Sequence, residues 1–122
     1  MPQHVLAAVD DMFFASKIRG CAGQSGIDVR FVRSVDAAIE SARLERPALI
    51  IGDLHWQRGD PFELAASLKR DDGLRDVPLI GFFSHVQTEL QRRAEQSGYD
   101  RVMPRSAFTK QLPDILEKIS QA

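Results

Sequence analysis

Five apolar segments alternate with five segments of helical periodicity, and this alternation restricts the possible folds more than any other feature of the chain. The apolar segments cover residues 4–9, 27–32, 47–52, 77–83 and 100–103. Several of them are apolar almost throughout, which is typical of parallel strands buried on both faces of a sheet. Helical spacing of apolar residues follows in residues 12–23, 34–46, 60–73, 86–98 and 108–119. Five strand–helix units in succession predict an α/β domain with helices on both faces of a parallel sheet.

The order of the strands in this sheet follows from general rules of connection. Right-handed crossovers and short connections leave few topologies, and the favoured one is the flavodoxin-like, doubly wound order 2-1-3-4-5. The predicted architecture is a three-layer (βα)5 sandwich. In such sheets a ligand crevice lies at the carboxyl ends of the strands, where the strand order reverses.

Two segments carry signals for the ends of helices. Asp60, Pro61 and Glu63 combine an N-cap, a proline at the first helical position and a capping box, which predicts a helix start. In the last helix Pro113 is compatible with the pattern only if it lies in the first turn, because proline lacks the backbone N–H that later turns require.

The size and composition of the chain suit one globular domain. Its 122 residues are 43% hydrophobic and 27% charged, and we expect residues 1–122 to form a single domain with no output domain on this chain. A net charge of -1 argues against nucleic-acid and membrane surfaces as partners. Cys21 is the single cysteine, and no apolar run approaches the length of a membrane span. We therefore expect a cytoplasmic protein.

Three carboxylates follow strands that the predicted topology makes neighbours. Asp10 and Asp11 end the first strand, and Asp53 ends the third. Like charges that lie close together raise one another's pKa unless a cation neutralises them. Mg²⁺, which binds a few carboxylates together with water and phosphate oxygens, is the natural partner. The alternative is that these residues are ordinary polar transitions from strand to loop.

Four motifs resemble those of bacterial response-regulator receiver domains, the CheY-like family, and the resemblance covers essentially the whole chain. "AAVDDMFFASKI" resembles the first strand and acidic pair, and "DLHWQRGDPFELAASLK" the segment from the phosphoacceptor aspartate into the third helix. "LIGFFSHV" resembles the fourth strand and its hydroxyl residue, and "SGYDRVMPRSAF" the fifth strand and the lysine–proline region. The acidic pair and the acceptor, at this separation within five strand–helix units, are the more specific of these features.

The resemblance implies roles for individual residues. Asp53 would accept a phosphoryl group from the phosphohistidine of a sensor histidine kinase or phosphotransfer protein. Asp10 and Asp11 would bind Mg²⁺ together with Asp53 and the backbone carbonyl of His55. Ser84 and Arg105 would contact the phosphoryl oxygens. The expected function is a switch that changes the binding of a downstream protein partner in two-component phosphorelay signalling, so the protein is better described as a signalling protein than as an enzyme.

Four positions depart from the pattern of the family: Gln57 and Pro61 replace a common proline and glycine after the acceptor, and Arg105 and Val102 lie closer to the expected chemistry and readout. Arg105 stands where receivers carry a lysine, and its planar fork can either hold a phosphoryl group or clamp the acidic pocket. Val102 stands where receivers often carry a tyrosine or phenylalanine that reports phosphorylation. The alternative function is therefore a phosphate-independent pseudo-receiver, a protein–protein interaction module. A flavodoxin-like cofactor binder is disfavoured, because the first strand–helix loop carries carboxylates that repel an anion.

Two further groups of residues have open interpretations. His55 and His85 flank the predicted pocket and could be exposed loop residues, could control the access of water to an acyl phosphate, or could bind a transition metal with Asp53. Arg92, Arg93, Arg101 and Lys110 could gather on the face of the fourth helix, fifth strand and fifth helix. Receivers use that face for partners or weak homodimers, although a solvated helical surface explains the same charges.

Overall fold

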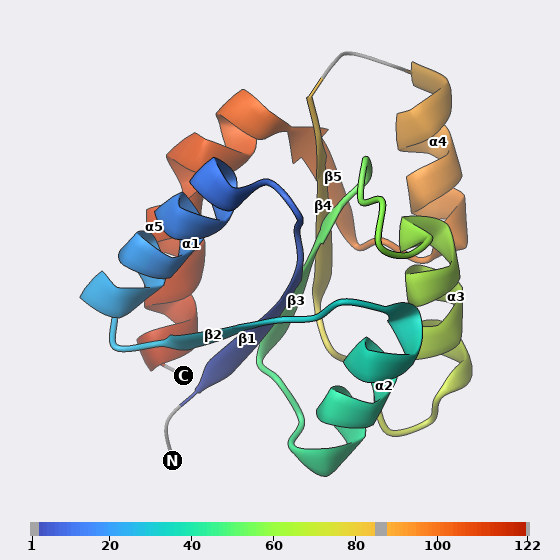
Figure 1. Ribbon diagram of the computed structural model, residues 1–122, viewed down its shortest axis with the longest axis horizontal. Coiled ribbons are helices and arrows are strands. Elements are labelled where there is room, and N and C mark those ends of the chain that lie inside the picture. Colours follow the sequence, from blue (N-terminus) through green and yellow to red (C-terminus); the bar gives the residue numbers. More distant parts are fainter. Residues whose placement is uncertain (1–2, 85–87, 122) are drawn as a thin grey trace.

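The fold is a five-stranded parallel sheet with helices on both faces (Figure 1). The computed structural model describes residues 3–84 and 88–121. The strands lie in the order β2-β1-β3-β4-β5, so the predicted flavodoxin-like topology is confirmed. The elements follow one another as β1 (His4–Ala8), α1 (Met12–Gln24), β2 (Asp28–Phe31), α2 (Val35–Leu44), β3 (Leu49–Asp53), α3 (Pro61–Arg70), β4 (Leu79–Phe83), α4 (Thr88–Ser97), β5 (Arg101–Pro104) and α5 (Arg105–Gln121).

Two apolar cores, one on each face of the sheet, hold the helices in place. Helices α1 and α5 cover one face, and α2, α3 and α4 cover the other (Figure 1). On the α1–α5 side the rings of Phe14, Phe82 and Phe108 pack with centroids 4.7 to 5.8 Å apart. On the other side Leu64 and Leu68 of α3 are buried against the sheet. Each such side chain stabilises the fold by roughly 2 kcal/mol through burial of apolar surface.

The start of α3 matches the predicted signal in part. The Asp60 carboxylate accepts the backbone N–H groups of the second and third helical residues at 2.9 and 3.3 Å, and Pro61 occupies the first helical position. The other half of the predicted capping box, in which the Glu63 carboxylate would accept the backbone N–H of Asp60, is wrong. Glu63 instead accepts hydrogen bonds from Ser67 and Arg70, because both lie on its own face of the helix within reach of the carboxylate.

The placement of Pro113 differs from the prediction. It lies inside α5 rather than in the first turn. Proline removes one helical hydrogen bond, but Pro113 is exposed, so water can reach the carbonyl of Thr109 that this bond would have used. The buried side chains of Leu112 and Leu116 keep the helix on the sheet. None of the helices within the described residues is long and apolar enough to cross a membrane.

The carboxyl ends of β1 and β3 meet at one edge of the sheet. Strands β1 and β3 are parallel neighbours, with Ala8 opposite Gly52. Asp10 and Asp11 follow β1, and Asp53 is the last residue of β3, so the topology brings all three acids to this edge.

Candidate functional site

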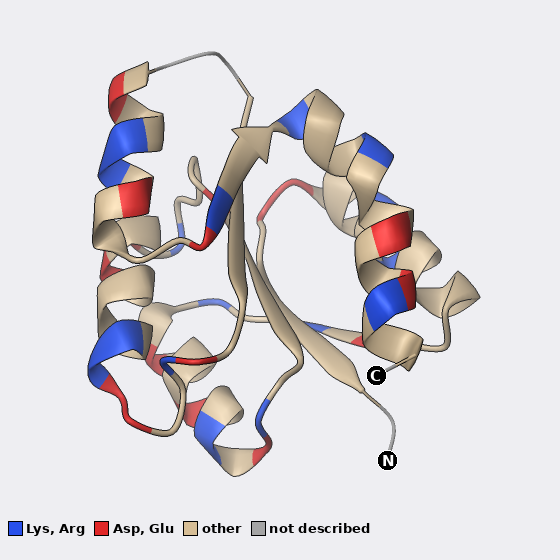
Figure 2. Ribbon diagram, turned by 180° about the vertical axis from the view of Figure 1, so that it is seen from behind, with Lys and Arg blue, Asp and Glu red and all other residues tan. Residues whose placement is uncertain are grey.

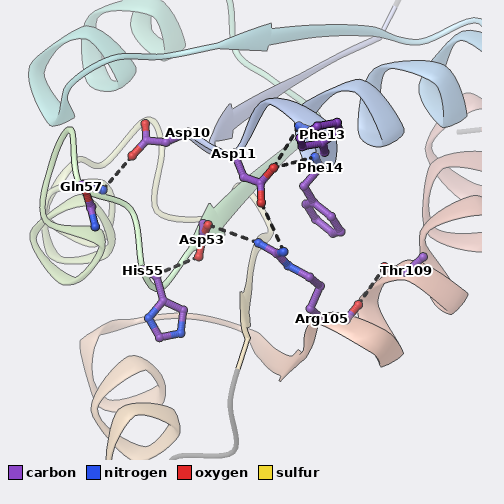
Figure 3. Close-up of polar contacts among 9 residues, drawn as sticks. All are labelled: Asp10, Asp11, Phe13, Phe14, Asp53, His55, Gln57, Arg105 and Thr109. Carbon is purple, nitrogen blue, oxygen red and sulfur yellow. Dashed lines mark hydrogen bonds and ion pairs between the residues drawn. The ribbon is translucent and has the colours of Figure 1, made fainter.

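Asp53 is a buried carboxylate at the end of β3. The residue is 5% exposed. Its Oδ1 accepts the backbone N–H of His55 at 2.8 Å, and its Oδ2 lies 4.0 Å from the guanidinium of Arg105 (Figure 3). Burial raises the pKa of Asp53 above its ordinary value, while the His55 N–H and the charge of Arg105 oppose this rise. A desolvated carboxylate with one weakly engaged oxygen is suited to act as a nucleophile.

Asp11 has two partners at the same edge. Its Oδ1 accepts the backbone N–H groups of Phe13 and Phe14 at 2.9 and 3.1 Å and so caps α1. Its Oδ2 lies 3.4 Å from a guanidinium nitrogen of Arg105. The hydrogen bond from the Phe14 N–H is the main cause that lowers the pKa of Asp11, so this group stays ionised beside Asp53.

Asp10 is directed at the loop between β3 and α3. Its Oδ2 accepts the backbone N–H of Gln57 at 2.8 Å (Figure 3) and that of Arg58 at 3.3 Å. Its Oδ1 is buried and accepts no hydrogen bond from the described residues, and the Arg58 guanidinium forms an ion pair with it at 3.2 Å. Asp10 therefore holds the loop that follows Asp53, and Arg58 supplies the opposing charge.

Arg105 is held where it reaches both Asp11 and Asp53. As the first residue of α5 it directly follows β5. Its guanidinium carbon lies 4.5 Å from the ring centroid of Phe14 and 5.6 Å from that of Phe82. The planar guanidinium stacks on such faces, which positions its nitrogen atoms beside the carboxylates. The acidic edge is thus partly neutralised by a cation of the chain itself.

The three carboxylates have the right chemistry to bind a divalent cation, but they are not arranged around a common site. Three carboxylates are the donors that Mg²⁺ prefers, and Asp10 has an oxygen without a hydrogen-bond donor. Within residues 3–84 and 88–121, however, no group of three or more His, Cys, Asp or Glu side chains is placed to hold a metal ion. Asp10 faces the loop and Asp11 faces Arg105. A shared ion requires that one of the two arginines release its carboxylate.

Comparisons with known proteins agree with this geometry. No protein-family model matches the chain. Over 98 residues, 80% of each chain, the protein is 29% identical to the polar-differentiation response regulator DivK of Brucella anthropi. This similarity is consistent with a divergent receiver domain. This similarity supports a role in two-component signalling, in which receivers act with histidine kinases or phosphotransfer proteins and with downstream partners.

Solved structures share the receiver fold over nearly the whole chain. The phosphorylated cyanobacterial phytochrome response regulator RcpA superposes with a TM-score of 0.80 at 22% identity, covering 99% of this chain and 93% of its own. A putative response regulator from Chloroflexus aurantiacus gives 0.85 at 16% identity over 100% of both chains. The Mn²⁺-bound form of response regulator Rcp1 gives 0.77 at 18% identity, covering 98% and 93%. At these identities the structures establish the fold of the receiver alone.

The remaining predicted site residues lie around the carboxyl edge of the sheet and do not join the cluster of Asp10, Asp11, Asp53 and Arg105. Ser84 follows β4 and is exposed, and within the described residues it makes no hydrogen bond to Asp53 or Arg105. His55 contributes its backbone N–H to Asp53, and its side chain is exposed. His85 lies outside the described residues.

Two residues of this edge were not predicted from the sequence. Arg58 lies in an irregular loop, and a loop has no hydrophobic periodicity from which its pairing with Asp10 could be predicted. Tyr99 is buried, donates its hydroxyl to the carbonyl of Pro61 at 2.9 Å, and lies across Gly52 and Gly81. These glycines are paired in register between β3 and β4. Glycine within a strand often marks a close approach by another group, so this pair was an available signal.

Proposed function

We propose that this receiver accepts a phosphoryl group on Asp53. The observation that carries the proposal is the environment of Asp53. A buried carboxylate ends the third strand, is oriented by the His55 N–H, and faces the fixed cation of Arg105. These are the features that in-line transfer to a carboxylate needs: a positioned nucleophile and a charge that stabilises the phosphoryl oxygens.

The reaction moves the phosphoryl group from a phosphohistidine of a sensor histidine kinase or phosphotransfer protein. An oxygen of Asp53 attacks the phosphorus, a new P–O bond forms, and the P–N bond breaks with its electron pair passing to the histidine nitrogen. Asp53 must be ionised for this attack, and Arg105 favours the ionised form. Arg105 then remains within reach of the oxygens of the acyl phosphate, the role for which receivers use a lysine.

Mg²⁺ is the proposed cofactor. Asp10, Asp11 and Asp53 would hold it together with the backbone carbonyl of His55, and the donor chemistry supports this choice. The ion would neutralise charge on the phosphoryl group during transfer. In the arrangement described above, Arg105 shares Asp11 and Arg58 pairs with Asp10, so binding has to displace at least one ion pair.

A second function is favoured by the same ion pairs. Because Arg58 and Arg105 already pair with Asp10 and Asp11, most of the negative charge at this edge is neutralised without metal or phosphate. Such a site suits a phosphate-independent pseudo-receiver that acts through its surface alone. The proposed surface for partners or a weak homodimer is the α4–β5–α5 face. There Arg101 bonds Gln111, and Arg92 and Lys110 are exposed, whereas Arg93 stacks on Phe62 of α3 at 4.0 Å and so contacts the neighbouring helix.

Phosphorylation by a small donor separates the two functions. The protein is incubated with acetyl phosphate with and without Mg²⁺, and the intact mass is measured. A mass gain of one phosphoryl group that requires Mg²⁺ and disappears in Asp53→Asn supports the acceptor. Asp72→Asn is the matched control, because this aspartate is exposed and remote in the sequence from all the acids of the site. No mass gain in a folded wild type, together with no response to beryllofluoride, supports the pseudo-receiver.

A further inference from the structure

A pocket of about 400 Å³ opens between α1 and the segment that joins β2 to α2. Three arginines from separate parts of the chain line it: Arg19 from α1, Arg33 from the connection after β2, and Arg58 from the loop after β3. Among the described residues that line the pocket, Asp10 is the single acidic one. Arg105 and Asp53 do not belong to this lining, so the pocket adjoins the candidate acceptor site and shares Asp10 and Arg58 with it.

The positive charge of this pocket is only partly neutralised. Arg58 pairs with Asp10 at 3.2 Å. Arg19 lies over the ring of Phe31 at 4.9 Å, and neither Arg19 nor Arg33 has a carboxylate partner within residues 3–84 and 88–121. Elsewhere on the molecule basic and acidic positions are interspersed along the helices (Figure 2), in a chain of net charge -1. Three guanidinium groups against one carboxylate make the pocket a local site for an anion.

We propose that this pocket binds a small ligand that carries a phosphate or diphosphate group. Guanidinium groups match phosphate oxygens with paired N–H donors. The charge of two or three guanidinium groups is matched more closely by a doubly charged phosphate than by a ligand with a single carboxylate. The pocket volume lies in the range of small-molecule sites. Met12, which is 83% exposed, and Phe31 supply apolar surface for the body of the ligand.

Binding of inorganic pyrophosphate in Mg²⁺-free buffer tests the proposal. The wild type is titrated and followed by backbone amide shifts and by calorimetry. We expect a dissociation constant below about 1 mM, with the largest shifts in residues 31–33 and at residue 58. In Arg19→Gln/Arg33→Gln the affinity should fall by about tenfold or more. Both arginines are exposed, so this variant should fold, and its thermal midpoint checks that it does.

The control variant is Arg46→Gln/Arg92→Gln. It removes the same charge from exposed arginines outside the pocket and should bind pyrophosphate within about twofold of the wild type. Equal weakening in both double variants would mean diffuse charge attraction and would overturn the proposal. So would unchanged binding in Arg19→Gln/Arg33→Gln, or no binding by the wild type up to about 5 mM. Citrate that binds as tightly as pyrophosphate would overturn the assignment to phosphate.

Discussion

Arg105 and Asp11, 94 residues apart in the chain, form an ion pair of 3.4 Å at the carboxyl edge of the sheet. The same guanidinium faces Asp53 at 4.0 Å and stacks on Phe14, the residue whose N–H bonds Asp11. One arginine thereby connects the start of α1, the end of β3 and the start of α5. The charge state of the candidate acceptor depends on this connection.

Removal of the Arg105 charge should raise the pKa of Asp53. Burial already raises this pKa, and Arg105 is one of the groups that oppose the rise. In Arg105→Gln we expect a higher pKa for Asp53 and also for Asp11, measured by NMR titration of the carboxyl carbons. Arg101→Gln, which removes a charge from β5 outside the cluster, should leave both values unchanged. Unchanged values in Arg105→Gln would show that the ion pairs do not form in solution.

Asp53→Asn should stabilise the fold at neutral pH. The pKa of Asp53 is raised on folding, so its ionisation destabilises the native state progressively as pH rises from the ordinary aspartate value through the raised value, and fully above it. The amide keeps an oxygen for the His55 N–H. Urea denaturation at pH 7 should give a free energy of unfolding larger by about 1 kcal/mol, and the gain should vanish in acid. Asp72→Asn is the control, and a loss of stability in Asp53→Asn would contradict the expectation.

Mg²⁺ and Arg105 should compete for Asp11. A cation that binds Asp11 and Asp53 has to displace the guanidinium that now lies beside both. Trp56, three residues after Asp53 and buried, offers a fluorescence signal for titration. Arg105→Gln should bind Mg²⁺ about fivefold more tightly than the wild type, and Asp11→Asn should lose most of the response. Equal affinity in the wild type and Arg105→Gln would place the ion away from this pair.

Tyr99 should make Gly81 intolerant of a side chain. A methyl group at Gly81 would lie 2.9 Å from the Tyr99 ring and 3.3 Å from Leu54. Gly81→Ala should therefore lower the free energy of unfolding by about 2 kcal/mol, and by less in a Tyr99→Ala background. Gly20→Ala is the control, because among the described residues no atom beyond its own helix lies within 4 Å of a methyl group there, and alanine favours the helix. Equal costs of Gly81→Ala in both backgrounds would exclude the clash with Tyr99 as the cause.

Tyr99→Phe tests the hydroxyl separately. The bond to the Pro61 carbonyl is buried, so Tyr99→Phe removes a buried hydrogen bond, although this carbonyl keeps its helical hydrogen bond at the start of α3. We expect a loss of about 1 to 2 kcal/mol in urea denaturation. Thr109→Val is the control, because it removes a half-buried hydroxyl that bonds within α5. A neutral Tyr99→Phe would indicate that water replaces the hydroxyl.

The sequence was sufficient for the layout of this protein because the signals for strands and helices are local. The apolar run before Asp53 and the cap at Asp60 each identify an element within a few residues. Once five such units alternate, handedness and connection rules leave few topologies, and the favoured one is the observed strand order. The strand order then brings Asp10, Asp11 and Asp53 to one edge of the sheet, and this follows without knowledge of any side-chain conformation.

Only the tertiary structure decided how those acids are balanced. Arg58 and Arg105 reach the edge through long side chains whose directions depend on packing against Phe14 and on the course of the loop after β3. Likewise Tyr99 fills a space that exists only because Gly52 and Gly81 are neighbours in the sheet. Contacts between residues far apart in the chain leave no periodic trace in the sequence, because they arise from the packing of finished elements rather than from the formation of each one.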